Sequence, residues 1–432
     1  MASNKTIFVY EHSKIKVGES YCGREGRLHE FEERHYKLLA NYLTKHPKAP
    51  YYSLYVNSIR FNQFVGVIKV GDLSIEVLPK TDKHEQLNEG DWQSVLLKML
   101  LISIQVEAKT TTKADITIRQ HSVLETYLSL FLKEAQRLIH RGLVKKYRTN
   151  IGNQSALKGK LLVHQQVTKN AVHAERFYVA HQVYNRDNVF NYIIKAALEC
   201  ICNIGSIGLT KEAQALLLYF PDCTPVKIDE KLFARLQYDR KTDGYRRALE
   251  LARIILLNYH PDLKGGSNQI LAIMFDMNLL WESFITWSLR RAVRDRGEVL
   301  AQAKKLFWHH EDNWNLRLKP DIVLKMDGET TIIDTKWKFQ SGVSIEDVRQ
   351  LYAYQHYFES NSGYLLYPNR LDKKSVVIEQ GDFYKPQKHA DQDRFTEMSC
   401  GLMFADLIDD EKQLRVDIGE EIVESLKFSC TI

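Results

Sequence analysis

The sequence predicts an α+β protein of several domains: a strand-rich N-terminal region, a helical middle and a C-terminal α/β domain. Its 432 residues exceed what one hydrophobic core ordinarily organises. Hydrophobic residues make up 44% and charged residues 26%, which is typical of a globular protein. The local patterning changes character twice, so we expect parts at residues 1–105, 106–265 and 266–432.

The first part has the patterning of short strands with one helix. Thr6–Tyr10 is a short apolar run of strand character. Val65–Val70 and Leu73–Leu78 flank a Gly-Asp pair, which favours a hairpin. Arg27–His46 is polar and has helical character.

The middle part is predicted to be mainly helical. Apolar residues between Leu124 and Ile139 recur at helical spacing. Further helices are expected at Asn188–Cys202 and Tyr245–Leu257. The glycine-containing stretch Leu263–Ser267 breaks this pattern, so we place a domain boundary there.

The last part alternates between helix and strand. A helix is expected at Leu279–Arg296, followed by strands at Asp321–Met326 and Thr330–Lys338. A second helix at Ser344–Glu359 and a strand at Gly363–Tyr367 complete the order. This order is that of an α/β domain.

The composition excludes several classes of protein. The net charge of +6 is too small to indicate nucleic-acid binding by itself. The six cysteines contain no CxxC pair, so neither a zinc site nor a disulfide framework is indicated. No signal peptide and no apolar run of roughly 20 residues is present. We therefore expect a cytoplasmic protein with reduced thiols and no membrane partner.

Two acids and a lysine near residue 330 have the pattern of a metal-dependent hydrolase. Asp321 follows a proline and opens a strand, and Asp334 follows two isoleucines and precedes Lys336 by two residues. Carboxylates are the ligands that Mg²⁺ prefers, and Mn²⁺ is an alternative. Because strand residues two apart share a face, Lys336 can position a water and stabilise negative charge. By chance alone such a pattern also occurs in ordinary surface hairpins.

The spacing predicts that the two acids meet. Asp327-Gly328 is a favoured two-residue hairpin turn, which would pair Met326 with Glu329. Counting back places Asp321 opposite Asp334, with Cβ atoms about 4.5–5.5 Å apart. Two carboxylates this close repel each other unless a cation lies between them.

Three more residues are candidates for supporting this site. Gln350 and Tyr354 are four apart on the expected helix and therefore share a face. Glu282 stands among large apolar residues on another helix and is a candidate third metal ligand. Glu282 is equally compatible with a surface acid beside an apolar helix stripe, and Gln350 and Tyr354 would be read as an ordinary polar helix surface without the neighbouring hairpin.

Basic residues near the site are candidate DNA contacts. The cluster within residues 290–296 can reach phosphates, although such clusters are more often solvated helix faces. The candidates are Arg290, Arg291, Arg294 and Lys338.

Other catalytic motifs are absent from the sequence. There is no GxxxxGK[ST], so we expect this chain to bind no nucleotide through a P-loop. HExxH and GxSxG are absent too, and the adjacent His309 and His310 point apart rather than forming a metal pair.

Several segments resemble McrC, the nuclease component of the McrBC modified-cytosine restriction systems. One is the pair GVI and IEVLPK at residues 66–80, and a second is L-x-G-x-L at residues 157–161. A third is D-N-x-x-N at residues 187–191, and a fourth is DMNxLWE at residues 276–282, where Phe is commoner than Trp. Their order along the chain is more specific than any one of them.

The resemblance implies a restriction-endonuclease-like PD-(D/E)XK nuclease domain with Asp321, Asp334 and Lys336 as its catalytic set. It also implies an McrB-like AAA+ GTPase as partner, docked on and stimulated by the N-terminal half, and double-stranded DNA with modified cytosine as substrate. A standalone repair or recombination nuclease, and a non-catalytic activator of an NTPase, are the alternatives.

Overall fold

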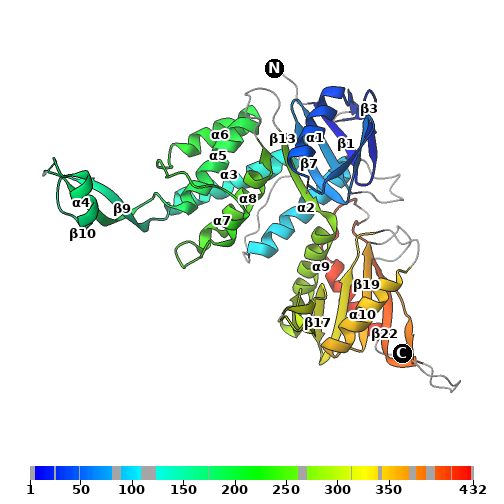
Figure 1. Ribbon diagram of the computed structural model, residues 1–432. Coiled ribbons are helices and arrows are strands. Elements are labelled where there is room, and N and C mark those ends of the chain that lie inside the picture. The colour runs from blue at the N-terminus through cyan, green and yellow to red at the C-terminus, as the bar shows by residue number, and fades with distance from the viewer. Residues whose placement is uncertain are drawn as a thin grey trace. The chain divides into compact units, whose positions relative to one another are not determined.

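The computed structural model divides the chain into two compact units (Figure 1). Unit 1 joins residues 1–120 to residues 264–432, and unit 2 contains residues 121–263. The predicted division into three domains stays a prediction, and the expected break at Leu263–Ser267 lies outside the described residues. The described residues are 5–23, 26–47, 49–79, 89–108, 123–173, 175–260, 270–312, 314–338, 343–368, 376–385, 395–409 and 411–429.

A mixed sheet in unit 1 joins segments from both ends of the chain. Its strands here are β1 (Lys5–Tyr10), β7 (Phe64–Val70), β8 (Leu73–Leu78) and β13 (Ile270–Asp276), in the order β1-β8-β7-β13. The expected hairpin is confirmed, because β7 and β8 are antiparallel around the Gly-Asp turn. β1 runs parallel to β8, and β13 pairs antiparallel with β7 although about 200 residues separate them.

Smaller elements surround this sheet, and one of them corrects a prediction. They are β2 (Lys14–Lys16), β3 (Ser20–Cys22), β4 (Leu28–Glu30), α1 (Glu33–Lys45), β5 (Tyr52–Tyr55), β6 (Ser58–Phe61) and α2 (Glu89–Ala108). The expected helix over Arg27–His46 is wrong in its first part, where β4 pairs with β3. The helix begins only after Glu32, whose side chain forms a capping box with His35.

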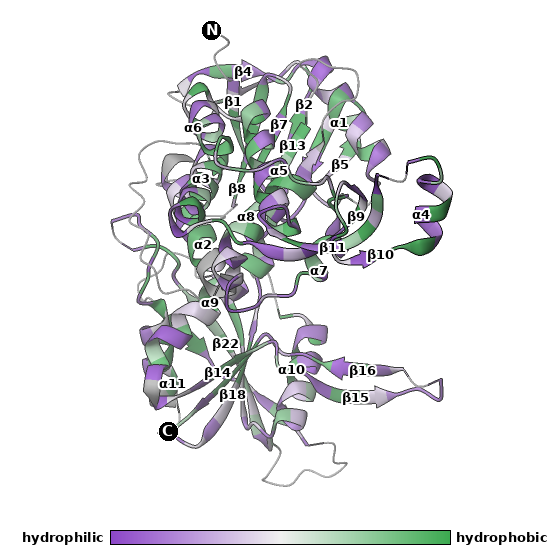
Figure 2. Cartoon of the chain, turned by 90° about the vertical axis from the view of Figure 1, so that its left-hand side faces the viewer, coloured by the Kyte–Doolittle hydropathy of each residue, from purple (hydrophilic) through white to green (hydrophobic). Residues whose placement is uncertain are grey.

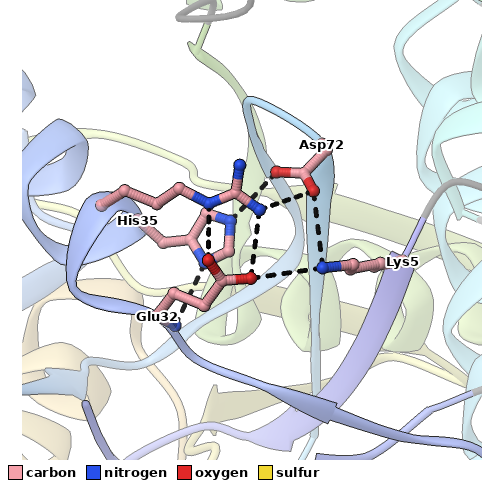
Figure 3. A network of polar contacts seen from close by, with 5 residues as sticks. Lys5, Glu32, His35 and Asp72 are labelled. Atoms are coloured by element: carbon pink, nitrogen blue, oxygen red, sulfur yellow. Dashed lines mark hydrogen bonds and ion pairs between the residues drawn. The ribbon is translucent and has the colours of Figure 1, made fainter. Parts of the chain in front are cut away.

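A network of charged side chains fastens α1 to the β7–β8 turn (Figure 3). Asp72 of that turn lies 3.1 Å from His35 Nε2 and 2.9 Å from an Arg34 guanidinium nitrogen. Lys5 Nζ lies 3.2 Å from Glu32 and 3.7 Å from Asp72. Burial alone would raise the pKa of Asp72, but the contacts with His35 and Arg34 hold it below its ordinary value.

Unit 2 combines a helical bundle with a small sheet. Its helices are α3 (Val123–Arg141), α4 (Val163–Lys169), α5 (Val189–Ile204), α6 (Ile207–Leu217), α7 (Glu230–Ala234), η2 (Asp243–Tyr245) and α8 (Arg246–Asn258). Its strands are β9 (Lys146–Gln154), β10 (Lys160–Leu161), β11 (Phe177–Asn185) and β12 (Tyr259–His260). The three long helices expected here are confirmed, whereas the β10-β11-β9 sheet was not expected. β9 is exposed along most of its length and carries no apolar alternation, so it has no strand signal.

The D-N-x-x-N motif has a structural role in unit 2. Asn188 caps α5 by accepting a hydrogen bond from Asn191 N at 3.2 Å. The buried amide of Asn191 donates to Val144 O at 2.9 Å and accepts from the Tyr245 hydroxyl at 2.8 Å. The motif therefore fixes where α5 starts and what it packs against.

The rest of unit 1 is a sheet covered on both faces by helices. In the described residues the strand order is β14-β17-β18-β19-β22-β20, with β21 paired to β22. The strands are β14 (Gly297–Ala301), β17 (Ile322–Met326), β18 (Glu329–Thr335), β19 (Ser362–Pro368), β20 (Val376–Glu379), β21 (Asp382–Tyr384) and β22 (Phe395–Ala405). The helices are α9 (Met277–Val293), η3 (Arg294–Arg296), α10 (Ile345–Phe358) and α11 (Ile418–Ser429).

The two faces of this sheet have different cores. Leu351 and Tyr354 of α10 pack with Val323, Ile332 and Leu365 on one face. α9 and α11 pack against each other and cover the other face (Figure 2). β18, α10 and β19 form a parallel β-α-β unit, so the acidic end of β18 lies beside the next strand. The expectation of a multidomain α+β protein is confirmed.

None of the described helices combines the length and the apolar character needed to cross a lipid bilayer.

The close approach of β7 and β13 generates a stability prediction. Gly66 has φ +137°, and a Cβ there would lie 2.2 Å from the Ile273 carbonyl oxygen. Gly66→Ala should therefore lower the free energy of unfolding by about 2 kcal/mol or more, measured by chemical denaturation. Gly18→Ala is the matched control, because φ is +84° but no atom lies within 4 Å of its Cβ. The control should cost about 1 kcal/mol, and equal losses would contradict the clash.

Candidate functional site

The β17–β18 hairpin has the register expected from its turn. Met326 pairs with Glu329, and Ile322 pairs with Ile333. The two turn residues have φ of +54° and +87°, as a type I′ turn requires. Asp321 immediately precedes β17, so continuing the same register places it opposite Asp334 at the end of β18. The predicted pairing of the hairpin is confirmed.

Asp321 is held by the residue that follows Asp334. Thr335 donates two hydrogen bonds to Asp321 Oδ2, from its backbone nitrogen at 2.8 Å and from its hydroxyl at 2.9 Å. These two hydrogen bonds fix the position of the Asp321 carboxylate at the end of β18. Thr335 was not singled out from the sequence, because a threonine in a buried strand carries no functional signal.

Asp334 and Lys336 form an ion pair on one side of β18. Lys336 Nζ lies 2.6 Å from Asp334 Oδ2 and 3.2 Å from Asp347 of α10. Asp347 also pairs with Lys338, so the structure brings this candidate DNA contact to the edge of the site. Asp347 had no sequence signal, because an acid in the first turn of a helix is common.

Burial and like charge change the proton affinity of this pair. Asp334 is 3% exposed, and its burial and the negative charge of Asp321 raise its pKa to about 6, against the opposing effect of Lys336. Burial alone would lower the pKa of Lys336, but the charges of Asp334 and Asp347 raise it above its ordinary value. Lys336 is therefore a fixed cation at neutral pH.

Glu282 approaches the hairpin from α9 and is tied to it by Gln302. Gln302 Nε2 donates to Glu282 Oε1 at 2.8 Å, and Gln302 N donates to the Asp321 carbonyl at 2.8 Å. Burial, followed by the charge of Asp321, raises the pKa of Glu282 to about 7. Gln302 follows β14 with an unusual φ of +50°, and nothing in its local sequence indicated this position.

Gln350 and Tyr354 share a face of α10, as their spacing predicted. Gln350 Nε2 donates to the Tyr354 hydroxyl at 2.6 Å, and that hydroxyl donates to the Lys319 carbonyl at 3.1 Å. Lys319 lies two residues before Asp321, so this pair braces the segment that leads into the hairpin. Burial, with further contributions from Asp334 and Asp321, raises the pKa of Tyr354.

The candidate arginines lie away from these acids. Arg290 and Arg291 occupy the last turn of α9, about 12 Å along the helix axis from Glu282. Arg291 and Arg294 line a cleft together with Glu420 and Glu424 of α11. The structure therefore brings Lys338 to the site but not the arginine cluster.

The donor set fits a hard divalent cation. Glu282, Asp321 and Asp334 lie close enough that the charge of Asp321 raises the pKa of the other two. Among the described residues, no three His, Cys, Asp or Glu side chains are gathered tightly enough to enclose a metal ion alone. Mg²⁺ commonly takes only one or two carboxylates and completes its coordination with water. Asp321 and Asp334 could hold Mg²⁺ in this way, and Glu282 is the candidate for a further ligand.

Comparison with known proteins identifies the family. A family model described as "McrBC 5-methylcytosine restriction system component" matches residues 59–368, which is more than half of the chain. The chain belongs to this McrBC family. The resemblance inferred from the ordered sequence motifs is therefore confirmed.

Solved structures from Thermococcus gammatolerans are similar to the chain. One is a half-complex from a tetradecameric assembly of McrB AAA+ hexamers with bound McrC. The match has 19% identity and a TM-score of 0.62 and covers 98% of this chain and 100% of the other, which shows a shared fold. A structure of the McrBC complex matches at 22% identity and a TM-score of 0.46, covering 67% of this chain and 89% of the other. A search of curated proteins returned no match.

The raised pKa of Glu282 predicts a pH-dependent stability. Because burial raises this pKa from 4.5 to about 7, ionising Glu282 is unfavourable in the folded chain. The stability that the chain gains from keeping Glu282 protonated is therefore lost as pH rises through about 7. Glu282→Gln cannot ionise, so it should raise the melting temperature by roughly 2–4 °C at pH 8 and leave it unchanged at pH 4.5.

Thermal melts at the two pH values measure this difference. Glu346→Gln is the matched control, because it makes the same substitution at an exposed position on α10. An equal gain for Glu282→Gln at both pH values would contradict the proposed cost of ionisation.

Proposed function

We propose that this chain is the DNA-cleaving subunit of an McrBC-type restriction system and a metal-dependent endodeoxyribonuclease. The observation that carries this proposal is the meeting of Asp321, Asp334 and Lys336 at the end of one hairpin. A P-D pair and a D-x-K triplet on neighbouring strands of a helix-covered sheet support a PD-(D/E)XK domain within residues 266–432. Membership in the McrBC family supports the same assignment.

The side chains have separable roles in phosphodiester hydrolysis. Asp321 and Asp334 would hold Mg²⁺ or Mn²⁺, with Glu282 as a further carboxylate. A divalent cation at this position would lower the pKa of the water bound to it and neutralise negative charge on the phosphate. Lys336 orients the attacking water and stabilises negative charge on the phosphate oxygens.

Neighbouring residues position this set. Asp347 contacts the ammonium of Lys336 at 3.2 Å and keeps it beside Asp334. Tyr354 holds the Lys319 carbonyl, and Gln302 holds the Asp321 carbonyl, so two hydrogen bonds fix the backbone around Asp321. We therefore regard Gln302, Asp347 and Tyr354 as positioning residues.

The two alternatives have less support. A standalone repair or recombination nuclease does not account for the match to the McrBC family over residues 59–368. A non-catalytic activator of an NTPase does not account for buried carboxylates of raised pKa beside a fixed lysine cation.

The proposal extends to partners. The similar Thermococcus structure contains McrB AAA+ hexamers with bound McrC. By analogy, we assign an McrB-like AAA+ GTPase as partner, with residues 1–105 contributing to docking, and modified-cytosine double-stranded DNA as substrate. The chain itself lacks GxxxxGK[ST], so hydrolysis of GTP belongs to the partner.

Loss of either the acid or the lysine should abolish DNA cleavage. Asp334→Ala removes a metal ligand, and Lys336→Ala removes the fixed cation, so each should reduce plasmid cleavage by about 100-fold or more. Cleavage by the wild-type chain with its partner should require Mg²⁺ or Mn²⁺ and stop in EDTA.

Lys325→Ala is the matched control, because Lys325 is exposed on the same hairpin. It should cleave like the wild type. Normal cleavage by a folded Asp334→Ala chain, or undiminished activity in chelator, would refute this assignment.

Stimulation of the partner should survive loss of cleavage. The full chain with Asp334→Ala should show no GTP hydrolysis alone, yet should raise GTP hydrolysis by the partner as much as the wild-type chain does. The reason is that the substitution changes only the end of β18. A steady-state phosphate-release assay measures this, and an unchanged rate on adding the wild-type chain would remove the activating role.

A further inference from the structure

A hairpin leaves the sheet immediately beside the acidic residues. It consists of β15 (Lys305–His309) and β16 (Asn315–Leu318), which are antiparallel to each other and pair with no other strand among the described residues. The hairpin begins shortly after Gln302 and ends shortly before Asp321. Figure 2 shows it extending away from the sheet near α10. Both ends of the hairpin therefore join the chain within a few residues of the candidate site.

This hairpin exposes large apolar side chains on a part of the chain that has no core. Trp308 is 45% exposed and Trp314 is 47% exposed, and Leu306 and Leu316 are at 62% and 49%. A two-stranded hairpin is at best marginally stable by itself in water. Apolar side chains gathered on such an element indicate a binding surface rather than a folding core.

The root of the hairpin is fixed to α10. A register irregularity between Leu306 and Trp308 displaces Phe307, whose ring packs edge-on against Tyr357 at 5.4 Å. Lys305 Nζ donates to the Tyr357 carbonyl at 2.6 Å and lies 5.0 Å from the centre of the Phe358 ring. These contacts hold the direction in which the hairpin points.

The outer half of the hairpin carries a cluster of three rings. Trp308 and Trp314 meet edge to face with centroids 5.0 Å apart, and His310 stacks on Trp314 at 4.9 Å. His310 N also donates to the Trp314 carbonyl at 2.9 Å. The rings are thus arranged before any ligand binds, which lowers the entropic cost of binding.

Charge indicates what this surface contacts. The acids Glu311 and Asp312 lie at the tip, whereas the positive charge is concentrated at the root, next to Asp321. The basic residues there are Lys304, Lys305, Arg317 and Lys319. Cations beside exposed aromatic rings match a nucleic acid, because phosphates bind the cations and bases or sugars pack on the rings.

We propose that the β15–β16 hairpin is a DNA-gripping element for the strand-cleaving site. In this role, Trp308 and Trp314 pack on bases or deoxyriboses that flank the cut, and Arg317 contacts a phosphate. About six residues separate the rings from the site, or roughly 20 Å of extended chain. That length corresponds to roughly six base pairs of duplex. The inference rests on the proposed function, since it takes DNA as the substrate.

DNA binding without cleavage tests this inference separately from the nuclease activity. The full chain is titrated in EDTA against a fluorescein-labelled 40-base-pair duplex, and anisotropy is measured at low and moderate salt. Trp308→Ala with Trp314→Ala should weaken binding by about tenfold or more. Arg317→Ala should weaken binding and make it less dependent on salt. Tyr384→Ala removes an aromatic residue on β21 that is 74% exposed, more than either tryptophan, and should stay within about twofold of the wild type.

Several results would overturn the inference. One is an unchanged affinity in the double tryptophan variant with a wild-type melting temperature. Another is a double tryptophan variant that no longer self-associates in sedimentation but still binds DNA. In that case the surface would be an interface between copies of the chain. If the double alanine variant does not fold, Trp314→Leu and Arg317→Ala decide the question, since each leaves Trp308 in place.

The two proposals can fail independently. If the wild-type chain binds the duplex through the hairpin but never cuts DNA with Mg²⁺ and a partner, the nuclease proposal fails and this inference stands. If the double tryptophan variant binds and cuts DNA like the wild type, this inference fails and the nuclease proposal stands.

Discussion

Repulsion between two carboxylates is the constraint on which the candidate site depends. The type I′ turn fixes the register of β17 and β18, and that register places Asp321 opposite Asp334. Asp334 is 3% exposed, so water cannot screen its charge. Thr335 stabilises Asp321 through two hydrogen bonds, and Lys336 stabilises Asp334 through an ion pair at 2.6 Å. Burial, followed by the remaining repulsion from Asp321, raises the pKa of Asp334, and a bound cation would relieve that repulsion.

The surrounding elements are arranged to maintain this unfavourable pair. Gln302 after β14, Asp347 at the start of α10 and Tyr354 later in the same helix each contact the acids, the lysine or the adjoining backbone. Burying a carboxylate makes its ionisation unfavourable and so lowers the free energy of unfolding at neutral pH. Such destabilisation is found where a charged site is needed for function. One of these elements, α10, also anchors the β15–β16 hairpin, because the root of the hairpin packs on the last turn of α10.

Unit 1 also links the site to the N-terminal sheet. β13 pairs with β7 and leads directly into α9, which carries Glu282. Trp337, next to Lys336 in the chain, donates to Glu11 Oε1 at 2.8 Å and packs against Trp281 at 5.7 Å. The segment after β18 therefore contacts the end of β1, so the two parts of unit 1 meet one residue from the lysine of the site.

The sequence by itself determined the features that depend on neighbouring residues. The Asp327-Gly328 turn was sufficient to predict the register that brings Asp321 opposite Asp334, and helical spacing placed Gln350 and Tyr354 on one face. The tertiary structure alone decided the approach of Gln302 and Asp347, the return of β13 to the N-terminal sheet, and the polar strand β9. Turn chemistry and hydrophobic periodicity depend on residues that are close together in the sequence, so both can be recognised from the sequence alone. Contacts between distant segments depend on how whole helices and strands pack, and local sequence patterns do not predict that packing.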